Sequence, residues 1–517
     1  MLAGALLLAA PLLAACTPAA AARALPGPPA LLALQDAELG DGQPAPYEDF
    51  GCAVSLDGDT ALVGADGKTV GGQAYAGAAY VYVRSGAGWS LQAALMDPSA
   101  VAGDGFGGAV ALHGDTALIG ADNRTVDGHD HAGAAYVYVR SGGIWSLQAE
   151  LTAAAAAAND WFGTSVALDG DNALVGAAGR TVGGQYYAGA ALVFTRAGGG
   201  WSQQAELTAG DGAAGDELGH AVALSGDTAL VGAENKNVAG AAGAGAAYVF
   251  TRAGGTWSPQ AELTAPDAAS RAGFGSALAV SGDTALVGAG GAPSGGRLAA
   301  GSAYVYARSG ATWSWQAQLT DPDGAAGDWF GSALVLSGDR ALIGAWGATV
   351  AGKSEAGAAY VFGRGAAGWA QLAKVTAPDA SYGDNFGTSL GLSGDTALLG
   401  APRKTVGAQP LAGVAYVYGL VPAPSLSLTA WPPSTRPGRP VTLGGVVTHA
   451  IADSTLVAIR RNVGGSLVLL KQLSLSSTGS FAWTMPVRKA GKQVLVATYT
   501  AGGVSFQSAP VTVVARK

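Results

Sequence analysis

Six aromatic residues could bind a ligand, because each occurs in only one or two copies of an otherwise regular pattern. Exposed aromatic rings beside carboxylates suit the binding of sugar rings or of peptide side chains. A structural role, in which the rings fill gaps between neighbouring units of the fold, is an equal alternative. The six ligand-binding candidates are Trp161, Trp329, Trp346, Tyr186, Tyr187 and Tyr382.

Two kinds of charged residue recur at regular spacing and could also take part in chemistry. This regularity favours a structural role, in which the charges cap turns and pair with each other, because a specific ligand site should break the repeat. The acids are Glu48, Asp104, Asp160, Asp216, Asp328 and Asp384, and Ala272 interrupts their series. The bases are Lys68, Arg124, Arg180, Lys236 and Lys404.

No catalytic motif accompanies these residues. The five histidines are not paired in sequence with a nucleophile, and the Gly-rich turns lack the strand-to-helix setting of a phosphate loop. The one cluster of metal-type ligands, Asp127-Gly128-His129-Asp130-His131, occurs in a single copy and is interpreted as a polar loop. We therefore predict a non-enzymatic protein without cofactor or metal. A glycosidase-type carboxylate pair remains an open alternative, because nothing in the sequence selects one pair of acids.

These residues are positioned by a repeat of 56 residues. An aromatic-glycine pair recurs at this step, and Leu218-Gly219 takes its place once. A tryptophan keeps the same step, from Trp89 to Trp369. A period near 50 is typical of propellers and arrays. The aromatic-glycine pairs begin at Phe50, Phe106, Phe162, Phe274, Phe330 and Phe386.

Each copy predicts four short strands. In the third copy these are 165–168, 173–177, 190–194 and 201–207, separated by Gly- and Asp-rich turns. Four antiparallel strands make one propeller blade. Short connections fall on one face of such a ring and long ones on the other, so we expect a ligand on the long-loop face.

The ring is predicted to close in its last blade, which combines three strands of the seventh copy with one strand from the N-terminal end of the repeat region. The seventh copy stops after Tyr418, without its tryptophan strand. The segment 33–39, ALQDAEL, resembles WSLQAEL at 145–151 and lies at the same distance before its phenylalanine. Closure hides sheet edges that would otherwise need capping. We predict an all-β protein with a seven-bladed propeller over residues 31–420.

The aromatic-glycine pair, the strand and the following Gly-Ala resemble FG-GAP repeats. The full Gly-Ala-Pro occurs once, at Gly400-Ala401-Pro402. The resemblance implies the propeller of integrin α chains and of many bacterial extracellular proteins, but it fixes the fold more than the function. Integrin-type repeats carry a calcium loop between the first two strands. Here that position is a tight turn such as 56–60, too short to supply six to eight oxygens.

The N-terminus predicts export. The apolar run at 1–16 is short for a membrane span and is typical of a signal peptide, which we place at 1–24 together with a tether. Leu13-Ala14-Ala15-Cys16 resembles a lipobox, so Cys16 is a lipidation candidate, and Ala22-Arg23-Ala24 offers a competing cleavage site. Cys52, the other cysteine, is interpreted as a small buried thiol.

Residues 424–517 are predicted to form a separate module. Six or seven short strands with turns between them indicate a small β-sandwich, which resembles bacterial Ig-like modules. Ten basic residues against Asp453 give the module a charge of +9, while the whole chain carries −8. A module of this charge could contact an anionic envelope polymer, lipid headgroups or its own acidic propeller, or remain a solvated face. Nucleic acid is not an expected partner of an exported protein.

Three functions are compatible with these features. The first is an exported bacterial surface protein, secreted or held at the membrane only by a lipid anchor, whose propeller binds protein or glycan without catalysis. The second is a polysaccharide-active hydrolase with its site on the same face. The third is a purely structural envelope component.

Overall fold

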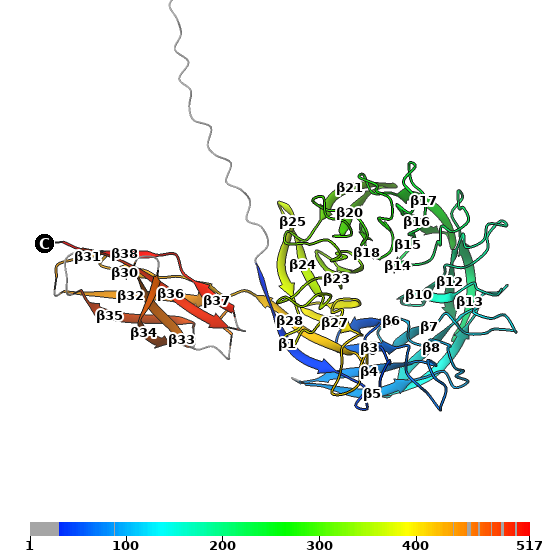
Figure 1. Cartoon of the computed structure of the whole chain (residues 1–517), viewed down its shortest axis with the longest axis horizontal. Coiled ribbons are helices and arrows are strands. Elements are labelled where there is room, and N and C mark those ends of the chain that lie inside the picture. The colour runs from blue at the N-terminus through cyan, green and yellow to red at the C-terminus, as the bar shows by residue number, and fades with distance from the viewer. Residues whose placement is uncertain are drawn as a thin grey trace, which may run out of the picture.

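The computed structural model describes residues 30–516 except 87, 438, 452–455, 464–465, 477, 488–490 and 502–503. The regular elements of this part of the chain are all β-strands, and it contains no helix long and apolar enough to cross a membrane. The strands form a ring of seven four-stranded sheets and a smaller module beside it (Figure 1). The predicted signal peptide and Cys16 lie outside the described residues.

The local sequence explains how each blade folds, as blade 4 illustrates. Its strands are β14 (Val222–Ser225), β15 (Thr228–Ala233), β16 (Ala246–Ala253) and β17 (Thr256–Leu263). The two-residue turn between β14 and β15 places Gly226 at a φ of 56°, as a tight hairpin requires. Every residue of β15 is buried, because this strand packs between neighbouring blades.

The other six blades repeat this order. The strands of blades 1 to 3 are β2 (Val54–Asp57), β3 (Thr60–Ala65), β4 (Ala78–Ser85), β5 (Gly88–Leu95), β6 (Ala109–His113), β7 (Thr116–Ala121), β8 (Ala134–Ser141), β9 (Ile144–Leu151), β10 (Phe162–Asp169), β11 (Asn172–Ala177), β12 (Ala190–Ala197) and β13 (Gly200–Leu207). Those of blades 5 and 6 are β18 (Leu278–Ser281), β19 (Thr284–Ala289), β20 (Ser302–Ser309), β21 (Thr312–Leu319), β22 (Ala333–Ser337), β23 (Arg340–Ala345), β24 (Ala358–Gly365) and β25 (Gly368–Val375).

Blade 7 closes the ring as predicted. It consists of β26 (Leu390–Ser393), β27 (Thr396–Ala401), β28 (Val414–Pro422) and the N-terminal strand β1 (Leu31–Leu39). β1 pairs antiparallel with β28, from Leu31 opposite Pro422 to Leu39 opposite Ala415. β26 in turn contacts β2 of blade 1. The seven-bladed propeller with closure by three strands and one is therefore confirmed.

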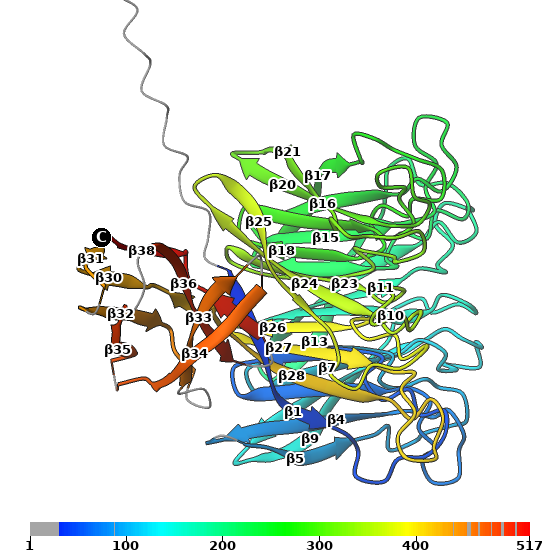
Figure 2. The same cartoon turned by 60° about the vertical axis from the view of Figure 1, so that its left-hand side comes forward.

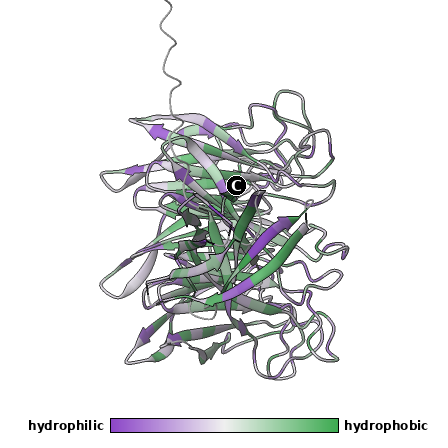
Figure 3. Ribbon diagram, turned by 90° about the vertical axis from the view of Figure 1, so that its left-hand side faces the viewer, coloured by the Kyte–Doolittle hydropathy of each residue, from purple (hydrophilic) through white to green (hydrophobic). Residues whose placement is uncertain are grey.

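The two faces of the propeller differ in their loops. The turns from first to second and from third to fourth strand form the short-turn face. The connections from second to third strand and from blade to blade form the long-loop face, which lies on the right in Figure 2. Figure 3 shows the apolar strand segments of the interior in green, with hydrophilic stretches at several strand ends.

Adjacent blades meet through two glycines. A Cβ on Gly232, at the end of β15, would lie 2.0 Å from the carbonyl oxygen of Gly275 in blade 5. Gly219 of blade 4 adopts a φ of 98° and donates its N–H to the carbonyl of Gly232 at 2.8 Å. The contact occurs at all seven junctions, where the other pairs are Gly64 with Gly107, Gly120 with Gly163, Gly176 with Gly219, Gly288 with Gly331, Gly344 with Gly387 and Gly400 with Gly51.

The aromatic residue before each of these glycines anchors the blade core. Phe106 is fully buried and packs on Tyr136 of strand β8, with ring centroids 5.3 Å apart. Leu218 fills the equivalent position of blade 4 and is also buried. The regular glycine and aromatic positions of the repeat therefore define the inter-blade contact and the core beneath it.

Arginines join blades on the short-turn face. Arg140 donates to Asp115 at 2.6 Å and to Thr60 of the preceding blade at 3.2 Å, and its guanidinium lies 5.2 Å from the ring centroid of Trp145. The repeated tryptophans thus serve as platforms for arginines. Blade 7 has Leu420 in place of this arginine. At the junction of blades 6 and 7, Arg340 of blade 6 stands at the position equivalent to Thr60. This arginine donates to Asp395 of blade 7 at 2.6 Å.

The C-terminal module consists of two sheets around one core. The first contains β29 (Ser425–Leu426), β30 (Thr429–Trp431), β32 (Pro440–Thr448) and β35 (Ser480–Pro486). The second contains β31 (Ser434–Thr435), β33 (Leu456–Val463), β34 (Ser466–Ser474), β36 (Gly491–Ala501), β37 (Val504–Gln507) and β38 (Val511–Ala515). Val441, Ile459 and Val513 are fully buried in the shared core. This arrangement supports a β-sandwich, and the Ig-like assignment stays a resemblance.

We predict that Gly232→Ala lowers the free energy of unfolding by about 1–3 kcal/mol, because the new methyl group forces blades 4 and 5 apart. Denaturant unfolding of the purified protein measures the change. The matched control is Gly210→Ala, since a Cβ there meets nothing within 4 Å. Equal stability of the two variants would show that the glycine contact is not needed for blade packing.

Candidate functional site

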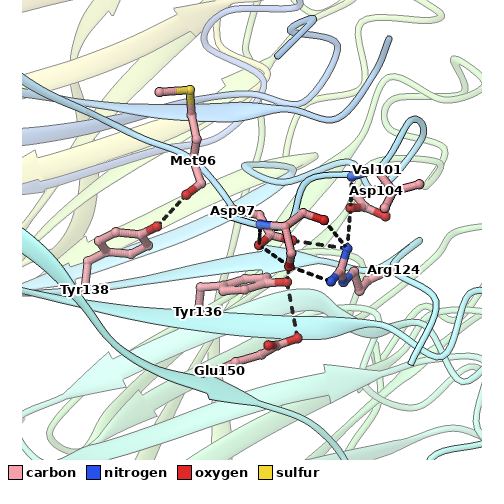
Figure 4. A network of polar contacts seen from close by, with 9 residues as sticks. Met96, Asp97, Val101, Asp104, Arg124, Tyr136, Tyr138 and Glu150 are labelled. Atoms are coloured by element: carbon pink, nitrogen blue, oxygen red, sulfur yellow. Dashed lines mark hydrogen bonds and ion pairs between the residues drawn. The ribbon is translucent and has the colours of Figure 1, made fainter. Parts of the chain in front are cut away.

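The regular charges of the long-loop face form a structural network, shown for blade 2 in Figure 4. Arg124 contacts Asp104 at 2.9 Å and Asp97 at 3.3 Å. Asp104 also accepts the backbone N–H of Val101, which caps the turn, and the hydroxyl of Tyr136 donates to Asp97 at 2.8 Å. The network therefore ties the inter-blade loop to the blade that follows it.

Blades 1, 3, 4 and 7 keep the pair of acid and base with different side chains. Arg180 contacts Asp160 at 2.6 Å, and Lys404 contacts Asp384 at 3.3 Å. Burial alone would lower the pKa of Lys404. The hydrogen bond to Asp379 and the negative charges of Asp384 and Asp379 have the larger combined effect, so the pKa of Lys404 is raised. These ion pairs confirm the structural interpretation of the regular acids and bases.

The irregular aromatic residues form two pairs on the same face. The rings of Trp329 and Trp346 stack with centroids 5.6 Å apart and planes at 20°. The rings of Trp161 and Tyr187 lie 5.3 Å apart at 40°. Trp329 and Tyr187 each keep 37% of their surface exposed. The two pairs therefore offer partly open aromatic surfaces.

The other two predicted candidates lie outside these pairs. Tyr186 is 72% exposed and Tyr382 is 75% exposed. Tyr47 and Tyr75 are exposed aromatic residues of the same loops that the sequence analysis did not select. Tyr47 precedes β2 and Tyr75 follows β3, so blade 1 also contributes aromatic surface.

The backbone beneath both tryptophans is unusual. Trp161 and Trp329, directly before the blade phenylalanine, adopt φ values of 53° and 57°. Side chains other than Gly and Asn rarely adopt this left-handed region, and such strain concentrates at functional sites. Other copies fill the position with residues that suit it better, such as Gly105, Gly273 and Asn385. Folding alone therefore does not explain tryptophan here.

Glycines make room for the Trp329 ring. A Cβ on Gly290 would lie 3.2 Å from its Cε3 atom, and one on Gly347 would lie 3.3 Å from its Cδ1 atom. Gly347 belongs to the blade of Trp329, whereas Gly290 belongs to the preceding blade. A Cβ on Gly347 would also lie 2.0 Å from the carbonyl oxygen of Gly327, so the backbone requires that glycine as well, and the two glycines leave space beside the indole.

Acidic residues occupy the same irregular positions in other copies. Asp49 and Glu217 precede the blade phenylalanine or its leucine substitute, as the tryptophans do. Asp66, Asp122 and Glu234 follow the Gly-Ala pair, where blade 6 has Trp346. The long-loop face therefore combines aromatic rings with carboxylates that lie outside the regular ion pairs.

Burial and mutual repulsion disturb the ionisation of these carboxylates in blade 1. Burial and the charge of Asp66 raise the pKa of Asp49 to about 6, against the lowering effect of Arg403. Burial also raises the pKa of Asp66 and of the Cys52 thiol beside it. Cys52 donates to the carbonyl oxygen of Gly107 at 3.6 Å and forms no disulfide.

Blade 4 brings three metal-type ligands together. Atoms of Glu217, His220 and Glu234 all lie within 4.8 Å of one another. Nδ1 of His220 is 3.3 Å from a carboxylate oxygen of Glu234. Burial raises the pKa of Glu234, and His220 opposes this effect. The predicted polar loop at 127–131 does not form such a group within the described residues.

These carboxylates were not among the predicted site residues. They break the 56-residue regularity at the same positions as the predicted aromatic residues, so the signal was present in the sequence. A comparison of the seven copies, position by position, would have identified Asp49, Asp66, Glu217 and Glu234 together with Trp161.

Comparison with protein families identifies the repeat. The FG-GAP repeat model matches residues 34–82, 89–138, 145–194, 201–250, 257–306, 313–362 and 369–418. The chain belongs to the FG-GAP repeat family. Each match runs from the outer strand of one blade through three strands of the next, so seven matches describe the closed ring of this FG-GAP protein.

Other comparisons add little. No curated protein matches the chain. Among solved structures, it is similar to a crystal structure of a mutant Salmonella alpha-2-macroglobulin at 10% identity, with a TM-score of 0.16. The alignment covers 92% of this chain and 40% of that one. A TM-score this low supports no argument about fold or function.

We predict a pH-dependent effect of Asp49→Asn. The pKa of the Asp49 carboxyl in the folded protein is raised to about 6, so the folded state favours the protonated form. The stability that this protonated carboxyl contributes at low pH is lost as the pH rises through 6. The variant avoids this loss. Its free energy of unfolding should exceed that of the wild type at pH 7.5 by about 1 kcal/mol, after allowance for solvent screening of the partly buried carboxyl.

Denaturant unfolding of both proteins at pH 4 and pH 7.5 measures this effect. Asparagine fits the backbone, because Asn385 adopts a φ of 53° at the equivalent position. A stability difference that does not change with pH would contradict the burial of this carboxyl.

Proposed function

We propose that this FG-GAP protein is a non-catalytic binding protein that is exported from a bacterial cell and recognises a glycan through its long-loop face. The observation that carries the proposal is the stacked pair of Trp329 and Trp346, which is partly exposed and has glycines of two blades beside Trp329. Partly exposed aromatic faces suit the apolar faces of sugar rings. A protein ligand on the same face is the alternative.

The attachment of the C-terminal module supports this arrangement. β28 leaves blade 7 at its short-turn end, and the N–H of Ala423 donates to the carbonyl of Ala30 beside it. The module thus joins the propeller on the side away from the long loops (Figure 2). We propose that it serves as a spacer or anchor while the long-loop face remains open.

The charge of the module suggests what it contacts. Its basic side chains include Arg436, Arg439, Lys471, Lys492 and Arg516, all of which are exposed. Exposed like charges attract polyanions through long-range electrostatics. We propose an anionic envelope polymer as partner of the module. The N-terminal signal and a lipid on Cys16 would place the protein at the cell surface, and cleavage beyond Cys16 would release it.

A polysaccharide-active hydrolase is the second candidate function. One carboxylate oxygen of Glu217 and one of Glu234 lie within 4.8 Å of each other, and retaining glycosidases also place two carboxylates near each other, about 5–5.5 Å apart. His220, however, approaches Glu234 at 3.3 Å and occupies the space beside it. We therefore favour binding over catalysis for this face.

We predict that Trp329→Gly abolishes glycan binding by the propeller on a glycan array, because it removes the stacked indole. Glycine suits the left-handed backbone there, as Gly273 shows at the equivalent position. The matched control is Trp315→Gln, which removes a 49% exposed tryptophan from β21 and introduces the residue found at Gln371. This control should bind like the wild type.

Other outcomes separate the alternatives. Glycan binding that persists in Trp329→Gly would contradict the proposed site. Release of reducing sugar ends from a bound polysaccharide, lost in Glu234→Gln, would replace binding by hydrolysis. Absence of glycan binding by the wild type would overturn the glycan proposal and leave a protein ligand or a structural role in the envelope.

A further inference from the structure

Three side chains from two separate segments of the long-loop face converge in blade 4. Glu217 and His220 belong to the turn that enters the blade, where the N–H of His220 donates to the carbonyl of Glu217 at 3.1 Å. Glu234 comes directly after β15 and lies fourteen residues after His220 in the sequence. Their potential ligand atoms lie within 4.8 Å of one another, and each residue is only partly buried. The site is therefore formed by the fold and is accessible to solvent.

The distances suit a tetrahedral metal centre. Ligand atoms about 2.0–2.1 Å from Zn²⁺ in a tetrahedral site lie about 3.3 Å apart. Nδ1 of His220 and the nearest oxygen of Glu234 are already separated by 3.3 Å. One ligand atom of each of the three residues lies within 4.8 Å of the others, and glutamate side chains have the rotatable bonds to close on a bound ion. Three protein ligands would leave one position for water or another ligand.

The ligand types select the metal. Imidazole nitrogen with two carboxylates suits Zn²⁺ and similar first-row cations. Ca²⁺ instead requires six to eight oxygens and does not favour imidazole. The calcium loop of integrin-type repeats lies in the turn between the first and second strands, which here follows β14. The cluster in blade 4 lies at the other end of β14.

Only blade 4 combines a histidine with carboxylates at these three positions. The equivalents of His220 are mostly small, and include Gly108, Ser276 and Ser332. Blade 1 has metal-type residues at the same three positions, Asp49, Cys52 and Asp66, but their ligand atoms do not form such a group within the described residues. Convergence is therefore a particular feature of blade 4.

We propose that Glu217, His220 and Glu234 form a binding site for Zn²⁺ on the long-loop face. This inference departs from the sequence-based expectation of a metal-free protein. It is independent of the proposed glycan function, because metal binding is measured without a glycan.

Isothermal titration of EDTA-treated protein with ZnCl₂ tests the site. The wild type should bind one Zn²⁺ per chain, and His220→Ser or Glu217→Asn should weaken the affinity at least tenfold. Both variants introduce residues that the chain already has at equivalent positions, Ser276 and Asn385, so folding should be retained. Thermal unfolding without metal checks this, and Co²⁺ absorption of the wild type reports tetrahedral coordination.

The histidine-containing loop at 127–131 provides the control. His129→Ala with His131→Ala removes two exposed histidines from blade 2 and should leave Zn²⁺ binding unchanged. Loss of binding in this control but not in His220→Ser would assign the metal to that loop and overturn the proposal. Absence of Zn²⁺ binding by the wild type, or unchanged affinity in folded His220→Ser, would overturn it as well.

Discussion

The propeller depends on the close approach of two glycines at each blade junction. In the first junction, Gly64 lacks the Cβ that would collide with the carbonyl of Gly107, and Gly107 has the left-handed φ of 100° that brings this carbonyl into place. The same contact between Gly400 and Gly51 joins the last blade to the first. Because seven identical contacts must close a circle, any other residue at these positions would disturb the geometry of the whole ring.

Electrostatic contacts then reinforce a ring whose geometry the glycines set. Arginines of the short-turn face join each blade to the one before, and the ion pairs of the long-loop face hold the inter-blade loops. The exception at blade 7 shows how a junction tolerates change. Leu420 removes one arginine, and Arg340 approaches the same kind of aspartate from the neighbouring blade. The pairing of charge is thus retained although its source differs.

The fold could be predicted almost completely from the sequence, because a strict 56-residue period fixes strands, turns and closure at once. The segment 33–39 identified the closing strand because it resembled the missing one. The candidate site was predicted only in part. Which rings pair depends on side-chain directions across separate loops, so Trp161 could not be assigned to Tyr187 rather than Tyr186 beforehand. Contacts such as Glu217 with Glu234 join segments on either side of a hairpin, and a one-dimensional pattern does not report side-chain distances.

The central claim is that regular positions build the scaffold and irregular positions of the long-loop face bind ligands. The most direct test is one variant that carries five substitutions at irregular positions. Each new residue is one that another copy of the repeat has at the equivalent position. The substitutions are Trp161→Gly, Trp329→Gly, Trp346→Ala, Glu217→Asn and Glu234→Ala. Thermal unfolding and glycan and Zn²⁺ binding are then measured together. The account predicts an unfolding temperature at or above that of the wild type, with both kinds of binding lost. An unfolded chain, or a folded chain that still binds glycan and Zn²⁺, would contradict it.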